Sequence, residues 1–244
     1  MNYSRNISQR RSALIAGISL LLMAVIAGLT YGYLHGNLVA AVDAQTTFEN
    51  LKTSKGLFYT EIFGWTVIFL LDALVAWSLY HFFKIANKGL AFISSSLRVI
   101  YTAFLGIAIY NLPQVMTIIN GQLGQIGMNN GMDEVMHHIN SFEDIWSKSL
   151  ILFGFHLTLL GFLAFKADYV PKIWGVLLVI AGFSYSYLHG MYAFFPQIKE
   201  HLIVIESILI LPMMVGEIGF AFWLVVKGGK QKQKVTSIAE AYIS

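Results

Sequence analysis

Six long apolar runs, separated by shorter polar segments, dominate the pattern of hydrophobic and polar positions along the chain. A transmembrane helix takes roughly 17–25 mainly apolar residues, and each run reaches that length. We therefore predict an all-α fold, a bundle of six transmembrane helices that forms a single membrane domain over residues 1–244. The predicted spans cover residues 12–34, 57–83, 90–118, 149–166, 173–195 and 202–227, and residues 228–244 form a tail.

The longest predicted connection, residues 119–147, begins rich in Gly and Asn and continues into a mixed polar and apolar stretch. We predict a short helix at the membrane surface over residues 132–138. An acid and a histidine stand four residues apart twice in this stretch, as Asp133 with His137 and Glu134 with His138. Such pairs share a helical face and suit metal chelation, but a solvated amphipathic helix is the favoured interpretation.

The composition agrees with an integral membrane protein whose main partner is the lipid bilayer. Hydrophobic residues make up 57% of the chain and charged residues 12%, whereas a soluble domain carries roughly 25% charged residues. The mean hydropathy is +0.65. The net charge of +3 does not indicate nucleic-acid binding, because the basic residues mostly flank the spans. The chain contains no cysteine, which excludes disulfides, thiolate metal sites and cysteine nucleophiles.

The distribution of Lys and Arg predicts how the spans are oriented. If the N-terminus is cytoplasmic, twelve of the sixteen basic residues lie on the inner side, which is the bias that membrane insertion favours. Six spans then leave both termini in the cytoplasm, and we expect a multi-pass protein of the bacterial inner membrane. The first run exceeds the roughly 7–15 residues of a signal-peptide core, so we expect it to remain as a span.

Two parts of the chain are close copies of each other. Residues 25–36 and 179–190 both begin Val-Ile-Ala-Gly and end Tyr-x-Tyr-Leu-His-Gly, and nine of their twelve positions are identical. The apolar run after each copy carries two acids eleven residues apart, which are Glu61 with Asp72 and Glu206 with Glu217. Eleven residues are close to three helical turns, so each pair lies on one face of its helix. This internal repeat predicts two related helical hairpins with polar groups facing inward.

Short motifs in the later spans indicate a family. Residues 153–157 read Phe-Gly-x-His-Leu, and residues 171–175 read Pro-x-x-Trp-Gly. Gly216-Glu217 and Trp223-Leu224 follow in the last span. With these motifs the chain resembles a bacterial six-span family known only as domain of unknown function forty-three eighty-six. The resemblance extends over most of the chain and implies a six-helix membrane protein without an established activity.

Four ionisable residues lie deep within four different spans, namely Asp72, Arg98, His156 and Glu217. Their positions along helices predict depths of roughly 12–17 Å from the cytoplasmic face. Each charge at such depth costs at least about 2.5–3.5 kcal/mol unless it is paired. We therefore predict a cluster in which Arg98 faces Asp72 or Glu217, with His156 bridging or capping it.

This predicted cluster has two interpretations. One is a buried ion-pair network that fixes how the helices pack. The other is a site for a small ligand or a proton, because one Arg with two carboxylates leaves one acid either protonated or open to a cation. We predict a non-catalytic or transport-like protein, with Arg98 as the fixed charge, Asp72 and Glu217 as titratable acids and His156 as proton relay.

A second set of polar residues, namely His35, His189, Glu61 and Glu206, lies near the outer ends of four spans. If the two hairpins are related by a pseudo-twofold axis, these side chains converge, and N/O ligands of this kind suit zinc or iron. The alternative function is thus a metal-dependent intramembrane hydrolase. Haem held between His35 and His189 would instead indicate an electron carrier. Ordinary interface tyrosines and helix-end histidines explain the same pattern without a cofactor.

Overall fold

The computed structural model describes residues 2–40, 43–122 and 128–230, and in these ranges it contains helices and no strand. The long helices are α1 (Asn2–Ala27), α4 (Lys55–Phe83), α5 (Lys88–Thr117), α7 (Met128–Lys166), α8 (Lys172–Phe194) and α9 (Lys199–Val226). The shorter elements are η1 (Gly28–His35), α2 (Gly36–Leu38), α3 (Ala44–Thr53), η2 (Ile118–Gln122) and η3 (Pro196–Ile198).

The six long helices form an all-α bundle of the kind that the apolar pattern predicts. Six helices of the described chain are long and apolar enough to cross a membrane. Their lipid-facing surface is visible on α4, where Phe63, Leu70 and Trp77 stand seven residues apart and are 69%, 61% and 53% exposed. An exposed apolar stripe of this kind suits contact with lipid, and together with the six helices that can cross a membrane it makes the chain a multi-pass membrane protein.

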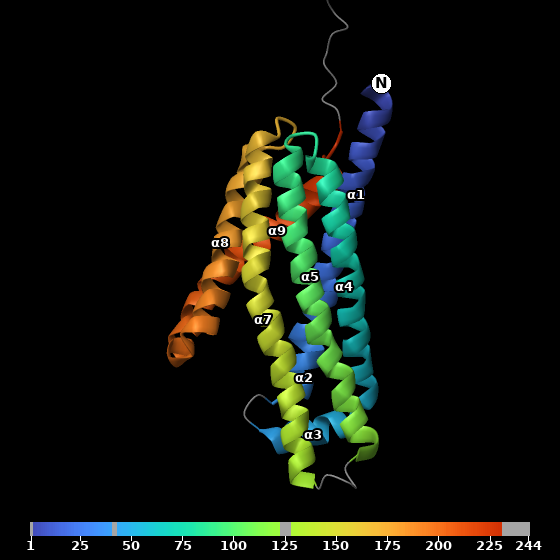
Figure 1. The fold of residues 1–244 in the computed structure, drawn as a ribbon, viewed down its shortest axis with the longest axis vertical. Helices are drawn as coiled ribbons and strands as arrows, with labels where there is room; N and C mark the ends of the chain where they lie inside the picture. Colours follow the sequence, from blue (N-terminus) through green and yellow to red (C-terminus); the bar gives the residue numbers. More distant parts are fainter. Residues whose placement is uncertain (1, 41–42, 123–127, 231–244) are drawn as a thin grey trace, which may run out of the picture.

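Neighbouring helices follow the order of the chain around the bundle. Helix α1 packs on α4, α4 on α5, α5 on α7, α7 on α8, α8 on α9, and α9 returns to α1. Figure 1 shows α4, α5 and α7 side by side along the full length, while α8 slants outward and α9 crosses behind. The arrangement closes the sequence of helices into a ring, so each long helix presents one face to a shared interior.

Glycines set the closest helix contacts, and two of them belong to the motifs at residues 153–157 and 171–175. A Cβ atom on Gly154 would lie 2.5 Å from the carbonyl oxygen of Gly182, and one on Gly161 would lie 2.7 Å from that of Gly175. Small residues at membrane helix interfaces let backbones approach closely. These antiparallel glycine pairs therefore fix α7 against α8.

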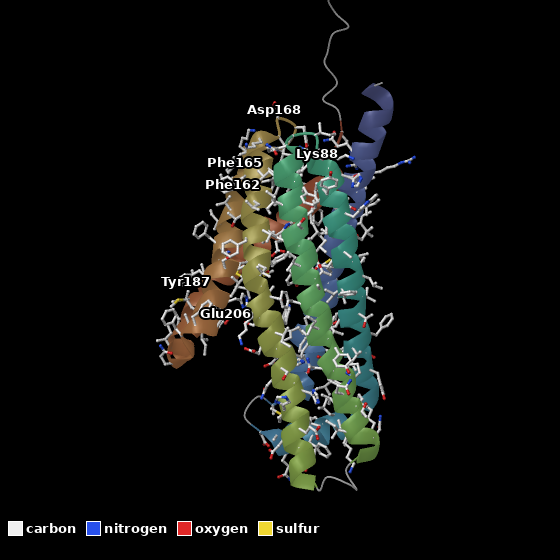
Figure 2. The ribbon with its side chains drawn as sticks, viewed as in Figure 1. Lys88, Phe162, Phe165, Asp168, Tyr187 and Glu206 are labelled. Atoms are coloured by element: carbon white, nitrogen blue, oxygen red, sulfur yellow. The ribbon has the colours of Figure 1, made fainter. Side chains whose placement is uncertain are left out.

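One end of the bundle carries the N-terminal part of α1 and the connections after α4 and α7; Lys88 and Asp168 lie there (Figure 2). Arg10 donates hydrogen bonds to the carbonyl oxygens of Leu224, Val225 and Gly228 at 3.0, 2.6 and 2.7 Å. Leu224 and Val225 lie in the last turn of α9 and Gly228 follows it, so Arg10 caps the C-terminal end of that helix and ties it to α1.

The fourth span differs from the prediction. Residues 132–138 do not form a separate surface helix, because α7 runs without interruption from Met128 to Lys166. Val135, Ile139 and Phe142 recur at helical spacing and are fully buried against the rest of the bundle. The amphipathic start of α7 therefore packs inward as part of one long helix, and most of the predicted connection over residues 119–147 is helical.

The two copies of the repeated sequence have different backbones. Residues 179–190 lie within the regular α-helix α8, whereas Gly28–His35 form a π-helix, in which the turns are wider. In the π-helical copy Thr30 is buried and packs so closely on Gly64 of α4 that a Cβ atom there would overlap it. The predicted relation between the two hairpins thus remains a prediction from sequence.

Candidate functional site

Three of the four deep ionisable residues meet in the bundle interior. Arg98 on α5 forms an ion pair with Asp72 on α4 through its Nη2 atom, and the two side chains are 1% and 0% exposed. Arg98 belongs to the buried stripe of α5, together with Ser94 and Tyr101 at helical spacing. On α4, Asp72 belongs to a buried stripe of the same kind and lies between Ile68 and Val75. We call Asp72, Arg98, His156 and Glu217 the Arg98 cluster.

His156 on α7 holds the guanidinium from the other side. Its Nδ1 atom donates to the carbonyl oxygen of Ser94 at 2.8 Å, which leaves Nε2 to accept from Arg98 Nη1 at 3.3 Å. This assignment of the ring proton follows from the hydrogen bonds. A proton on Nε2 would turn an N–H group toward the cation, so the contacts favour a positioning role for His156 over the predicted relay role.

Glu217 on α9 reaches the cluster across a small cavity. Arg98 and Glu217 are the two ionisable residues that line it, and the other lining residues are apolar. The cavity is small and leaves room for about one water molecule. All six long helices contribute to its wall, through Leu20, Leu79, Arg98, Leu160, Leu178 and Glu217.

The partners of Glu217 differ from those of Asp72. Among the described residues Arg98 forms its ion pair with Asp72, whereas Glu217 interacts with the hydroxyl of Tyr185 on α8 and electrostatically with Arg98. The Nε atom of Arg98 is buried without a hydrogen-bond partner among the described residues. The structure therefore brings Asp72, Arg98 and His156 into direct contact and places Glu217 at the cavity beside them.

The second set of predicted residues forms a different arrangement. His35 lies between two carboxylates, with its Nδ1 atom 2.6 Å from Glu61 Oε1 and its Nε2 atom 2.9 Å from Glu143 Oε1. Glu61 comes from α4 and Glu143 from α7, and η1 supplies the histidine. We call His35, Glu61 and Glu143 the His35 cluster. Sequence reasoning missed Glu143 because the start of α7 was predicted to be a connection.

Aromatic side chains surround the His35 cluster. Tyr31 stacks on His35 with ring centroids 5.1 Å apart, and Phe142 lies 6.0 Å from the same ring. Trp65 and Trp146 continue this aromatic packing, with centroids 4.8 Å apart. The apolar surroundings strengthen the interactions between His35 and the carboxylates, because a low dielectric weakens them less than water does.

His189 and Glu206, the other two predicted metal ligands, make contacts of their own. His189 Nδ1 is 2.9 Å from Ser147 Oγ, and the Tyr192 hydroxyl donates to Glu206 at 2.6 Å. Among residues 2–40, 43–122 and 128–230, no three His, Asp or Glu side chains are arranged to hold a metal ion. The metal and haem hypotheses therefore remain predictions that this geometry does not favour.

The class of protein follows from the fold and the buried charges: a polytopic helical membrane protein with charged residues in its interior. The chain belongs to the family of the domain of unknown function DUF4386, whose model matches residues 15–228. It is similar to an uncharacterised protein of Archaeoglobus fulgidus, with 30% identity over 187 residues that cover 72% of this chain and 88% of that protein. No solved structure matches the chain.

Proposed function

We propose that the protein is a non-catalytic, transport-like membrane protein that binds a proton or a small ligand at the Arg98 cluster. The observation that carries this proposal is the cavity at which all six long helices meet, with Arg98 and Glu217 in its wall. Ionisable residues in membrane spans mark ion and proton pathways more often than they serve packing alone. A cavity shared by every helix also allows their movement to change access to it.

The charge balance assigns a role to each residue. Asp72 already neutralises Arg98, and His156 accepts a hydrogen bond from it as a neutral ring. Glu217 is then a second carboxylate near a cation that Asp72 already neutralises. An ionised carboxylate in apolar surroundings is costly, so Glu217 binds a proton or a small cation more readily than Asp72 does. The small size of the cavity favours the proton.

We further propose that both termini are cytoplasmic and that the protein lies in the bacterial inner membrane. Support comes from the excess of Lys and Arg that the positive-inside rule would leave on the cytoplasmic side. Arg10 and Lys88 lie at the end of the bundle that this orientation turns inward. Labelling of single cysteines placed at residues 86 and 120, in intact cells, tests the orientation: only the second should react with an impermeant reagent.

Proton uptake into lipid vesicles that contain the purified protein and a pH-sensitive dye tests the function. Wild type should take up protons when a membrane potential is imposed, and Glu217→Gln should lose most of that uptake. Asp144→Asn is the matched control, because Asp144 is an exposed acid of α7. If both Glu217→Gln and Asp72→Asn take up protons as wild type does, the Arg98 cluster is not the site.

Elemental analysis of the same purified protein decides between this proposal and the metal-dependent alternatives. Protein prepared without chelators should contain no stoichiometric zinc or iron. Zinc at one ion per chain that is lost in a His35→Gln, His189→Gln double variant would revive the hydrolase hypothesis. Iron would instead call for an absorption spectrum for haem.

A further inference from the structure

Both ring nitrogens of His35 face carboxylate oxygens. The distances, 2.6 Å to Glu61 and 2.9 Å to Glu143, are hydrogen-bond distances on both sides of the ring. A neutral imidazole carries one N–H group, so its other nitrogen would point a lone pair at a carboxylate lone pair. The contacts are both favourable only if the cluster holds one proton more than a neutral histidine and two ionised acids.

We propose that the His35 cluster is a second proton-binding site, in which a doubly protonated imidazole passes protons between Glu143 and the buried Glu61. This site does not depend on the Arg98 cluster, because the two share no residue and no direct contact in the described chain. The ligand class is the proton, and the ordinary state of the cluster is an imidazolium between two carboxylates.

The exposure of the three side chains gives the relay a direction. Glu143 is 37% exposed, His35 is 5% exposed and Glu61 is 0% exposed. A proton can therefore reach Glu143 from outside the bundle, while Glu61 is fully buried and contacts the ring. The Oε2 atom of Glu61 is buried without a hydrogen-bond partner among the described residues, so this carboxylate can hold an arriving proton.

The relay step conserves protons and needs no other reactant. A proton on Glu143 moves to Nε2 of His35 when that nitrogen carries a lone pair. The O–H bond of Glu143 breaks and an Nε2–H bond forms, which gives the doubly protonated ring. The ring then releases its Nδ1 proton to Glu61 Oε1, so an N–H bond breaks and an O–H bond forms on Glu61. The same two transfers in reverse return the proton to Glu143 and restore the starting state.

The groups around the cluster favour the doubly protonated ring. The facing acids are Glu61 from α4 and Glu143 from α7, and Tyr31 stacks on the ring. Glu206 from α9 also interacts electrostatically with Tyr31, which adds negative charge nearby. Within the described residues, His35 is the one basic group paired with Glu61 and Glu143. The π-helix that positions His35 agrees with this role, since such turns often occur at functional sites.

Nitrogen NMR of protein labelled at its histidine rings tests the proposal directly. A doubly protonated ring gives two ring nitrogens of similar chemical shift, whereas a neutral ring gives two widely separated ones. At about pH 8.5, some two units above the ordinary histidine value, free rings are almost entirely neutral. We expect one doubly protonated ring at that pH, and its signal should disappear in His35→Gln and persist in His189→Gln.

Glu143→Gln keeps every histidine and alters a partly exposed side chain, so it should fold. In this variant the doubly protonated signal should be lost at a pH about 1 unit or more lower than in wild type. A wild-type spectrum with only neutral rings at pH 8.5 would overturn the proposal. So would a Glu143→Gln titration identical to that of wild type. Glu217→Gln should leave this signal unchanged, which separates the test from that of the Arg98 cluster.

Discussion

The Arg98 cluster and the His35 cluster both bury a basic residue against acids, but the central base differs. Arg98 stays charged at every accessible pH, because a guanidinium cannot release its proton in a protein. His35 can change its charge, and it contacts two carboxylates where Arg98 pairs with one. The permanent cation of Arg98 therefore orders the groups around it, whereas His35 can gain or lose a proton in response to the acids around it.

This difference predicts how much stability each cluster loses when one of its acids is replaced by the amide of the same shape. Asp72→Asn should have the largest effect, because it leaves Arg98 as an unpaired charge at 1% exposure. Removing one partner of a buried ion pair costs about 3–5 kcal/mol. Thermal unfolding of the protein in detergent, followed by circular dichroism, should show a large loss of stability. Arg98→Met combined with Asp72→Leu should recover most of it, because the pair is then replaced by apolar side chains.

If the double variant is as unstable as Asp72→Asn alone, the two side chains do more than compensate each other's charge. Proton uptake separates the two interpretations of the Arg98 cluster. A double variant that is stable and still active would make the cluster a packing device. A double variant that is stable but takes up no protons would instead show that the Arg98 cluster serves proton uptake.

Glu61→Gln should have a smaller effect than Asp72→Asn, although Glu61 is as deeply buried. The amide oxygen can still accept a hydrogen bond from His35 Nδ1, and the doubly protonated ring is then balanced by the one remaining carboxylate, Glu143. We expect a cost of about 1–2 kcal/mol, typical of a changed buried hydrogen bond. The same unfolding measurement should show it. A loss equal to that of Asp72→Asn would remove the distinction between the two clusters.

The sequence predicted most of the fold and part of each cluster. Helical rise is constant, so distance along an apolar run gave the shared depth of Asp72, Arg98 and His156, and these three do meet. The near-identical copies of the repeated sequence predicted equivalent positions for His35 and His189, but these residues contact different partners. No local pattern contains that difference, because the π-helix around His35 packs through Thr30 on Gly64 of another helix.

Glu143 shows a second limit of the pattern. The start of α7 alternates polar and apolar residues at helical spacing, which is typical both of a surface helix and of a membrane helix that packs on neighbours. The assembled bundle shows that the segment packs on neighbouring helices, because it buries Val135, Ile139 and Phe142. Hydropathy alone therefore does not reveal that Glu143, which lies in such a segment, contacts His35.

The smallest predicted effect lies outside both clusters and serves as their control at high pH. The Tyr169 hydroxyl, in the connection after α7, donates to the carbonyl oxygen of Phe82 at 2.9 Å. Burial raises the pKa of Tyr169 well above its ordinary value of about 10. The unfolded chain therefore loses this proton first, so its contribution to stability is constant below about pH 10 and falls as the pH rises further.

Tyr169→Phe should cost about 1 kcal/mol near neutral pH, because it removes one hydrogen bond. The difference in melting temperature between wild type and this variant should shrink above about pH 10, since phenylalanine does not titrate. Changes in stability that depend on the His35 cluster should instead be unaffected by Tyr169→Phe. A pH dependence below about pH 10 that disappears in Tyr169→Phe would show that the connection after α7, and not the His35 cluster, controls how the bundle responds to protons.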